Sequence, residues 1–519
     1  MGFVVRNCSW RRILFLLVLG AVCAIRLSLL DRPLDRDEGE YAYAGQLMLA
    51  GIPPYKLAYN MKLPGTYAAY AAVFAVFGES VQAVHLGLLL ANLATIVLVA
   101  LLGKRLFGGT GGVCAGIVYA VLSCMPNVLG LTANASHFVM LMAVAGFWLL
   151  LESRESRNWL LAASGFCMGA TFLMKQPGAA FVVFGLVYLI AKRARWTAIF
   201  IFTAAAAAPF AGTCLVLARA HVFEKFWFWT VSYGSQYGSL IAPGMGLVKL
   251  LGMLPQVAGP ALLLWGMAVA GLMTGSRPTK FLLGGWLLAS AAAVSAGLYF
   301  RSHYFVMLLP ALALLCAAAV TNWISQGRPR FAIVVLSVAC ALPAIWNADY
   351  FRRLTPQQAA VTSFGANPFQ EAIPLARYLR EHSSPDARIA VLGSEPEIYF
   401  YSQRHSATGY IYAYGLMEAQ PYARQMQDEM IREIETAQPE YVVYVTSPLS
   451  WLRERESDPH IFTWAKRYLD ERYQLIPLPE TERKLSLYRR RDRSVEPSRV
   501  SAFALQQRAG VNGLLGQTR

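Results

Sequence analysis

The sequence contains very few acidic residues over most of its length. Between positions 41 and 348 only four occur, and they are Glu79, Glu152, Glu155 and Glu224. A short acidic segment, Asp35-Arg36-Asp37-Glu38-Gly39-Glu40, directly precedes this stretch. Carboxylates that stand out in an apolar background are costly unless they have a partner or a function. We therefore take residues 31–64 as the first candidate region for a functional site.

Cysteine is missing from the C-terminal region. The last of the eight cysteines is Cys340, and no CxxC or Cys/His metal-binding spacing occurs in the chain. These absences exclude a disulfide in the C-terminal region in any compartment. Most of the cysteines fall within apolar segments, where a thiol behaves as a small hydrophobic side chain.

Charged residues are scarce overall, at 15% against 56% hydrophobic residues, and the mean hydropathy is +0.41. This composition excludes a soluble multidomain protein, and the apolar runs are long enough to span a bilayer. The net charge of +16 arises from Lys and Arg in short clusters between these runs. Such clusters indicate membrane topology, so we do not expect nucleic acid as a partner.

We predict a polytopic α-helical membrane protein with about eleven crossings. The first follows Arg11 and Arg12 and runs to about Leu30. It lacks a convincing cleavage site, so we expect an uncleaved helix with its amino end inside. The others lie near 81–103, 111–129, 137–151, 158–174, 178–191, 197–218, 255–274, 281–299, 303–321 and 331–348. Basic residues fall at every second junction between spans, for example Arg154 and Arg157, which marks these junctions as cytoplasmic. An odd number of crossings then places the chain after about Asp349 on the outer side of the membrane.

Two short helices are predicted within the first outer loop, residues 31–80. The first begins near Asp37 and stops at Gly51, and Asp37 and Glu40 have the spacing of a capping box. The second opens at Lys62-Leu63-Pro64 and ends at Gly78. Neither is long enough to cross a core about 30 Å thick, so both lie on the outer surface. For Asp37, helix capping and chemistry remain equally open.

A soluble α/β domain is predicted over residues 351–490, because twenty of the thirty acids of the chain lie beyond position 350. Its expected elements are helices at 368–382, near Glu397 and at 416–436, strands at 388–392 and 441–445, and a hairpin near 475 and 485. It contains no Gly-rich phosphate loop, nucleophile elbow or metal cluster. Residues 491–519 are rich in Arg, Ser, Gln and Gly and are predicted to be disordered.

Several polar groups converge on the outer side of the predicted membrane domain, residues 1–350. They are the carboxylates Asp37 and Glu38, the cations Lys62, Lys175 and Arg301, and His303. The segment 219–243 adds an aromatic surface, which forms an interfacial belt or a ligand groove. Such a set suits an anionic head group on an apolar tail, since cations hold phosphate and a carboxylate acts on a second substrate. The alternative for each cation is snorkelling to the interface.

The order of five motifs carries a resemblance. They are Asp37-Glu38 with Tyr41-Ala42, Gly51-Ile52-Pro53-Pro54-Tyr55, Lys62-Leu63-Pro64-Gly65, Lys175-Gln176-Pro177-Gly178, and His303-Tyr304 ahead of Leu309-Pro310. Over about residues 10–350 this order resembles bacterial membrane glycosyltransferases of the GT-C fold, which are similar to protein O-mannosyltransferases and to the aminoarabinose transferases of lipid A. The stretch 388–404 is also similar to the soluble domain of such proteins.

The resemblance implies an inverting glycosyltransferase in the bacterial inner membrane that moves a sugar from a polyprenyl-phosphate carrier. The acceptor is an envelope glycan, lipid or protein on the periplasmic or extracellular side. By this resemblance Asp37 is the base that takes the acceptor proton, and Glu38 orients the acceptor or helps to bind a metal. Lys62 contacts the carrier phosphate. Arg301, His303 and Tyr304 correspond more loosely to phosphate or sugar contacts.

Two departures from the family pattern affect these implications. Many relatives have an acid where this chain has Asn134-Ala135-Ser136-His137, and neither Ser136 nor His137 can replace a carboxylate as a ligand for a hard metal ion. We therefore assign no metal ligands and no certain cofactor, while a divalent cation remains open. Relatives often have proline directly after the lysine, where this chain has Leu63.

Two other classes of protein compete with the enzyme. A multi-span transporter shares the many spans and few charges, although the ionisable groups here sit at span ends and no repeat is visible. A membrane-anchored binding or scaffold protein would place its function in residues 350–490.

Overall fold

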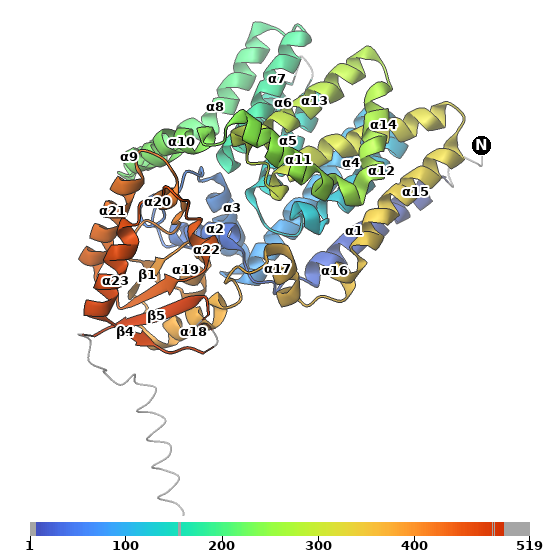
Figure 1. Ribbon diagram of the computed structural model, residues 1–519. Coiled ribbons are helices and arrows are strands. Elements are labelled where there is room, and N and C mark those ends of the chain that lie inside the picture. The colour runs from blue at the N-terminus through green and yellow to red at the C-terminus, as the bar shows by residue number, and fades with distance from the viewer. Residues whose placement is uncertain (1–6, 154–156, 480, 482, 492–519) are drawn as a thin grey trace, which may run out of the picture. The chain divides into compact units, whose positions relative to one another are not determined.

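The computed structural model describes residues 7–153, 157–479, 481 and 483–491, and it divides into two compact units on either side of the Asn367–Pro368 bond. Figure 1 shows a helical unit, coloured blue to yellow, and a smaller unit with a sheet in orange and red. The first unit extends past the predicted boundary at residue 350, because two short helices, up to Phe364, belong to it. Arg154 and the predicted disordered residues 492–519 lie outside the described residues.

The first unit consists of helices. In chain order they are α1 (Asn7–Leu27), α2 (Arg36–Leu49), α3 (Gly65–Phe77), α4 (Val81–Ser123), η1 (Pro126–Val128), α5 (Ala135–Glu152), α6 (Asn158–Met174), η2 (Gln176–Gly178), α7 (Ala179–Ala191), α8 (Trp196–Arg219), α9 (Phe223–Trp227), η3 (Phe228–Tyr233), α10 (Gly234–Ser239), α11 (Pro243–Ala258), η4 (Gly259–Ala261), α12 (Leu262–Met273), α13 (Arg277–Ser295), η5 (Ala296–Leu298), η6 (Ser302–Leu308), α14 (Leu309–Ser325), α15 (Pro329–Trp346), α16 (Ala348–Arg352) and α17 (Pro356–Phe364).

Seven helical stretches among the described residues are long and apolar enough to cross a membrane. They are Val81–Ser123, Ala135–Glu152, Trp196–Arg219, Pro243–Met273, Arg277–Leu298, Ser302–Ser325 and Pro329–Trp346. Helix α4 covers two of the predicted crossings, because the chain kinks at Gly108, where φ is 75°. Helices α6 and α7 match two further predicted crossings but are shorter apolar helices. The number eleven stays a prediction.

The stretch Ser302–Ser325, which comprises η6 and α14, forms the centre of this unit, since 94% of its most apolar part is buried, against 17% for α15. Small residues let its neighbours approach closely. A Cβ added to Gly271 of α12 would lie 1.9 Å from the carbonyl oxygen of Leu315. Glycine at such a contact is the usual means by which membrane helices pack backbone to backbone.

Helix α2 is where we expected it, but its cap differs from the predicted one. The N-cap is Asp35, whose Oδ1 accepts hydrogen bonds from the backbone N–H groups of Asp37 and Glu38. The Glu38 carboxylate closes the capping box by accepting from the Asp35 N–H. The predicted capping box of Asp37 and Glu40 is therefore wrong by two residues, and the side chains of both are left for other contacts.

Helix α3 also matches its prediction, since it ends at Gly78 with φ of 79°. Ser80 then caps α4 by accepting a hydrogen bond from the Ala83 N–H, at 3.1 Å. The positive φ at Gly78 is a conformation that glycine adopts without strain.

The second unit is built on a mixed five-stranded sheet with the order β2-β1-β3-β5-β4. Strands β2, β1 and β3 are parallel, whereas β5 pairs antiparallel with β3 and β4. The strands are β1 (Arg388–Leu392), β2 (His405–Ser406), β3 (Tyr441–Val445), β4 (Tyr473–Ile476) and β5 (Leu485–Arg490). The helices are α18 (Ala372–His382), α19 (Glu397–Ser402), α20 (Tyr414–Met417), α21 (Ala423–Ala437), α22 (Pro448–Trp451) and α23 (His460–Arg472).

The predicted strands β1 and β3 are confirmed residue for residue, and the predicted hairpin is the β4–β5 pair. The helix predicted over 416–436 is wrong in its first part, since the chain breaks between α20 and α21, where Pro421 lies. Proline lacks the N–H that a continuous helix would need. Helix α23 was not predicted.

Candidate active site

A cavity of about 330 Å³ in the first unit brings together six of the seven predicted site residues. They come from four segments of the chain: α2, the loop before α3, the α6–η2 junction and the start of η6. These residues are Asp37, Lys62, Lys175, Arg301, His303 and Tyr304. Their sequence separation is up to 267 positions, so the fold and not local sequence assembles the set.

Lys62 and two carboxylates form the charged centre of this cavity. The Lys62 ammonium donates to Asp37 Oδ1 at 2.7 Å and to Glu40 Oε2 at 2.6 Å. It also lies 4.5 Å from the centre of the Tyr41 ring. The other oxygen of Glu40 accepts from the Tyr67 hydroxyl at 2.5 Å. Glu40 is fully buried, whereas the side chains of Asp37 and Lys62 are each 23% exposed.

This arrangement separates the pKa values of the two carboxyl groups. Burial by itself would raise the pKa of Asp37, but the surrounding cations, with Lys62 first, hold it well below its usual range. For Glu40, burial is the largest effect and raises the pKa despite Lys62. Burial of the Lys62 ammonium is outweighed by Asp37 and Glu40, which raise its pKa well above the usual value. Asp37 is thus an ionised carboxylate at the cavity wall.

Contacts between the loop before α3 and the end of α6 bring Lys62 and Lys175 to the same cavity. A Cβ on Gly65 would lie 2.6 Å from the backbone of Leu173, so only glycine allows this approach. The Thr66 hydroxyl donates to the carbonyl of Met174 at 2.9 Å, and the Gln176 amide donates to that of Met61 at 2.5 Å. The Gly in Lys62-Leu63-Pro64-Gly65 and the Gln in Lys175-Gln176-Pro177-Gly178 therefore join the two motifs.

The remaining cations of the cavity rest on aromatic rings. The Lys175 ammonium lies 3.8 Å from the centre of the Tyr304 ring. Arg301 lies over Tyr299 at 5.5 Å, and Tyr299 stacks on Tyr237 at 4.6 Å. Burial lowers the pKa of Lys175 to about 7, and Lys62 and Arg301 act in the same direction against Asp37. Aromatic faces hold these cations in place without neutralising their charge.

Glu38 is the one predicted site residue that does not line the cavity. Its carboxylate is fully buried, forms a salt bridge with Arg32 at 3.1 Å and accepts a hydrogen bond from the Ala133 N–H at 2.6 Å. His85 lies 3.4 Å away on the same oxygen. Burial is outweighed by Arg32 and these hydrogen bonds, which lower the pKa of Glu38 to about 2. The geometry favours a structural role for Glu38.

Sequence reasoning missed Glu40, Tyr41 and Tyr299 as cavity residues or contacts. The capping-box pattern assigns Glu40 to a cap, although a further acid two positions after Glu38 is itself a signal. The aromatic segment predicted as belt or groove contributes to the cavity at one end, through Thr230, Gly234 and Tyr237. Elsewhere it packs on the outer loop, with Trp229 stacked on Tyr59.

In the part of the chain that the structure describes, no group of three or more His, Cys, Asp or Glu side chains is arranged to hold a metal ion. The two carboxylates nearest the cavity share the Lys62 ammonium. The structure supplies no observation that assigns a ligand to the divalent cation left open above.

Comparison with known proteins adds evidence from sequence. The family described as dolichyl-phosphate-mannose-protein mannosyltransferase matches residues 62–219, a range that includes Lys62 and Lys175. A curated relative from Pseudomonas aeruginosa (strain LESB58), undecaprenyl phosphate-alpha-4-amino-4-deoxy-L-arabinose arabinosyl transferase, is 31% identical over 212 residues. The match spans 37% of this chain and 38% of that relative.

Solved structures extend the similarity to nearly the whole chain. ArnT from Cupriavidus metallidurans bound to undecaprenyl phosphate superposes with a TM-score of 0.61 at 16% identity, covering 92% of this chain and 97% of that one. The oligosaccharyltransferase AglB from Archaeoglobus fulgidus, in complex with an inhibitory peptide and a dolichol-phosphate, gives 0.51 at 12% identity over 94% and 75%. These likenesses show the fold.

The local sequence matches, the shared fold and the apolar spans agree with one another. The chain is an integral membrane protein with several spans, and it is related to the GT-C membrane glycosyltransferases of the mannosyltransferase and ArnT type.

Proposed function

We propose that this protein is an inverting glycosyltransferase that takes a sugar from a polyprenyl-phosphate carrier and passes it to a hydroxyl or phosphate oxygen of an envelope acceptor. The observation that carries the proposal is the pairing of Asp37 with Lys62 in a cavity that also holds Lys175 and Arg301. A base and a set of cations that can hold a leaving phosphate are the two components that this reaction needs. The named relatives, which use or bind polyprenyl phosphates, support the same reading.

In the proposed reaction the acceptor oxygen attacks the anomeric carbon of the donor sugar. The new bond between that carbon and the acceptor oxygen forms as the bond between the carbon and the phosphate oxygen breaks. Where the acceptor is a hydroxyl, its proton passes to the Asp37 carboxylate. The phosphate changes from a singly charged diester to a doubly charged monoester, so its negative charge grows during the reaction. Lys62, Lys175 and Arg301 are placed to stabilise that growing charge.

Asp37 in the resting site is a weak base, because Lys62 holds its pKa low. A bound donor phosphate competes with Asp37 for the Lys62 ammonium. As Lys62 shares its charge with the phosphate, the attraction that lowers the Asp37 pKa decreases, while burial and the nearby Glu40 continue to raise it. Asp37 therefore becomes a stronger base when the donor is in place, which restricts proton transfer to the loaded site.

The remaining residues have simpler proposed roles. The Tyr304 ring contacts the Lys175 ammonium, and the Tyr299 ring, stacked on Tyr237, contacts the Arg301 guanidinium. These aromatic rings therefore position the cations. His303 lines the same cavity and is proposed to contact the sugar or the phosphate. We further propose eleven crossings in a bacterial inner membrane, with the cavity and the C-terminal unit on the periplasmic or extracellular side.

The test is transfer from a labelled polyprenyl-phosphate sugar by the purified full chain in lipid nanodiscs. Asp37→Asn should lower the rate by about 10³-fold, since general-base catalysis contributes on the order of 10²–10⁴. Asp349→Asn is a matched control, because Asp349 is exposed and pairs with Arg353, the residue that follows the same short helix. Full activity of Asp37→Asn in folded protein would remove Asp37 as the base.

A second measurement tests the sidedness. A cysteine placed at exposed Ala50, in a chain whose other cysteines are replaced, should react with an impermeant maleimide in intact cells. Labelling that required cell lysis would place the outer loop in the cytoplasm and overturn the proposed reaction.

A further inference from the structure

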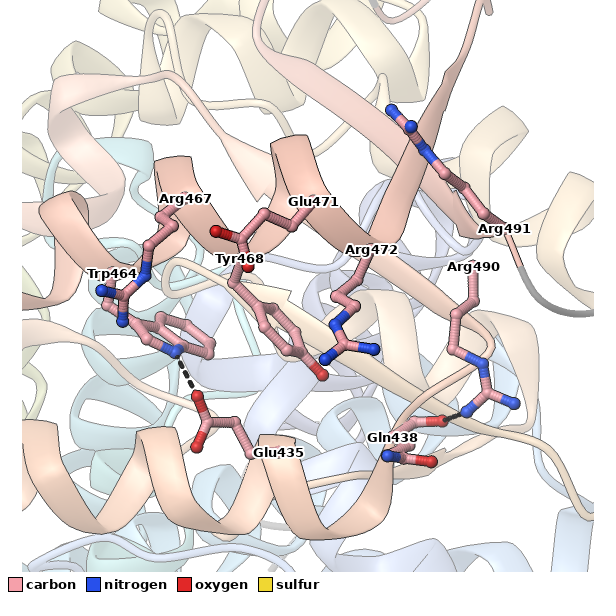
Figure 2. Close-up of a pocket in the computed structure, with 9 residues that line it drawn as sticks. All are labelled: Glu435, Gln438, Trp464, Arg467, Tyr468, Glu471, Arg472, Arg490 and Arg491. Carbon is pink, nitrogen blue, oxygen red and sulfur yellow. Dashed lines mark hydrogen bonds between the residues drawn. The ribbon is translucent and has the colours of Figure 1, made fainter.

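The second unit contains a surface pocket of about 700 Å³ between α21, α23 and the end of β5 (Figure 2). We call it the arginine pocket. Four arginines line it, together with two aromatic side chains: Arg467, Arg472, Arg490, Arg491, Trp464 and Tyr468. The proposed transfer reaction uses none of these residues.

The pocket carries an excess of positive charge. Against the four arginines it contains two carboxylates, Glu435 and Glu471. Glu435 accepts a hydrogen bond from the Trp464 indole at 2.8 Å. Arginine side chains that gather on one surface repel one another, so such an arrangement favours an anionic ligand. The planar guanidinium group matches phosphate and carboxylate oxygens in pairs, which gives geometric selectivity.

Backbone contacts hold two of the arginines. Arg490 donates from Nη1 to the carbonyl oxygen of Gln438 at 2.5 Å, and Arg491 donates from Nε to that of Tyr473 at 2.8 Å. Figure 2 shows Arg490 extending toward Gln438, and Arg472 extending from α23 toward the end of α21. Side chains held in this way lose less conformational freedom when they bind a ligand.

One face of α23 supplies the aromatic part of the pocket. Trp464, Tyr468 and Arg472 follow one another at intervals of four residues, so they lie along one side of the helix. The rings of Trp464 and Tyr468 stack at 4.9 Å, and Tyr468 also lies 5.4 Å from Tyr473. Ligand sites commonly combine such apolar rings with a few polar groups that fix orientation. Trp464 is buried and supports Tyr468, which is half-buried and offers the accessible ring of this surface to the C–H face of a sugar.

We propose that the arginine pocket binds an anionic saccharide, a sugar chain that carries phosphate or carboxylate groups, as part of the acceptor. The proposal rests on the proposed glycosyltransferase function for its biological role. It adds to that function the class of acceptor and a second place on the protein where the acceptor is held.

Binding is measured on the full chain in nanodiscs without any donor. The probes are a phosphorylated N-acetylglucosamine disaccharide, a glucuronate-containing disaccharide, the neutral disaccharide and inorganic phosphate. We expect one or both anionic disaccharides to bind at least tenfold more tightly than the neutral sugar and than inorganic phosphate. Raising the salt concentration should weaken that binding, because exposed charges are screened.

The variant that tests the site is Arg467→Gln with Arg472→Gln, which removes two charges of the pocket. Its matched control is Lys466→Gln with Arg483→Gln, two exposed cations of the same unit that do not line the pocket. The pocket variant should weaken binding of the anionic disaccharide at least tenfold and the control less than twofold. In the transfer assay the pocket variant should raise KM for an anionic acceptor while kcat stays within twofold.

If the pocket variant and the control variant lost affinity for the anionic disaccharide equally, the binding would depend on net charge alone, and the arginine pocket would not be the binding site. If inorganic phosphate bound as tightly as the anionic disaccharides, the proposal that the pocket recognises a saccharide would be wrong. Failure of the proposed reaction is seen separately, because Asp37→Asn tests transfer, whereas saccharide binding is measured in the absence of donor.

Discussion

Asp37 and Glu38 are adjacent in sequence, yet they lie in different environments. Successive residues of a helix point about 100° apart, so one carboxylate reaches the cavity and the other the protein interior. Asp37 is 23% exposed and shares Lys62 with Glu40, whereas Glu38 is fully buried and holds Arg32, His85 and the Ala133 N–H. Both pKa values are lowered, so ionisation alone does not distinguish the two carboxylates.

What distinguishes them is where their partners come from and whether a substrate can compete for those partners. Lys62 lines the cavity, so a donor phosphate can draw it away from Asp37. Arg32 is 1% exposed, so no substrate reaches it, and its pairing with Glu38 is permanent in the folded protein. We therefore assign the two neighbouring carboxylates different roles, Asp37 in the proposed reaction and Glu38 in the stability of the fold.

The largest expected effect is a loss of folding stability on substitution of Glu38, the buried carboxylate of the two. Glu38→Gln removes the charge that pairs with buried Arg32, and breaking such a pair from one side costs about 3–5 kcal/mol. We expect a large fall in the midpoint of thermal unfolding, measured by size-exclusion chromatography after heating. Activity per folded molecule should fall far less than in Asp37→Asn.

Glu79→Gln is the matched control, because Glu79 is exposed and pairs with the Gln46 amide. It should leave the midpoint unchanged. A Glu38→Gln protein with normal thermal stability and no transfer would reverse the comparison and give Glu38 the catalytic role.

A smaller effect is expected at Glu40, which lies on the cavity side but touches no substrate in the proposed reaction. Glu40→Gln keeps a group that can accept from Tyr67 but removes a negative charge beside Asp37. The pKa of Asp37 should fall further, because a negative neighbour that raises it is lost. A fall of one unit corresponds to about a tenfold loss of proton affinity. We expect kcat to fall about tenfold, with KM for the donor little changed.

Steady-state kinetics with a purified donor separates these two constants. A rise in donor KM at constant kcat would instead make Glu40 a contributor to phosphate binding. Tyr67→Phe is the companion variant, because it removes one hydrogen bond to Glu40 and keeps its charge. It should lower kcat less than Glu40→Gln does.

The comparison also shows where sequence reasoning was effective. Lys62, Lys175, Arg301, His303 and Tyr304 could be chosen because ionisable groups at the ends of apolar spans are rare and their order matched a known family. The strands β1 and β3 were predictable because short apolar runs bounded by polar residues favour buried strands. The signal for the strands was local, whereas the site residues were chosen from the order of motifs along the chain.

The misassigned cap had a different origin. Four acids within six residues allow two capping boxes, Asp35 with Glu38 and Asp37 with Glu40. Their local patterns are equivalent, but their distant partners differ: Glu38 accepts from the Ala133 N–H, 95 positions away, whereas Asp37 and Glu40 share Lys62. Long-range partners of this kind leave no trace in the segment itself.

Helix α23 is different again, because its signal was present. Ile461, Ala465 and Leu469 recur every four residues and are all buried, which is the pattern of an amphipathic helix.

The smallest expected effect concerns the pH dependence of donor binding through Lys175. Its pKa is lowered to about 7, so the side chain is charged below pH 7 and increasingly neutral above it. The sugar-linked donor is a phosphodiester whose charge stays constant between pH 6 and 8.5, so Lys175 sets the trend. We expect the Kd of the donor to rise about threefold over this range, a modest change typical of one partly exposed charge. A bound phosphate raises the Lys175 pKa, which spreads the change toward higher pH.

Lys175→Arg sharpens this measurement, because arginine stays charged throughout the range. The variant should bind the donor with a Kd that hardly depends on pH, and its affinity should match that of the unmodified protein at pH 6. Tyr304→Leu should weaken binding at pH 6 without changing the direction of the pH trend, since it removes the ring beneath the ammonium and not the charge. If Lys175→Arg kept the full pH dependence, another cavity group would carry the titration, and Lys175 would lose its role in holding the phosphate.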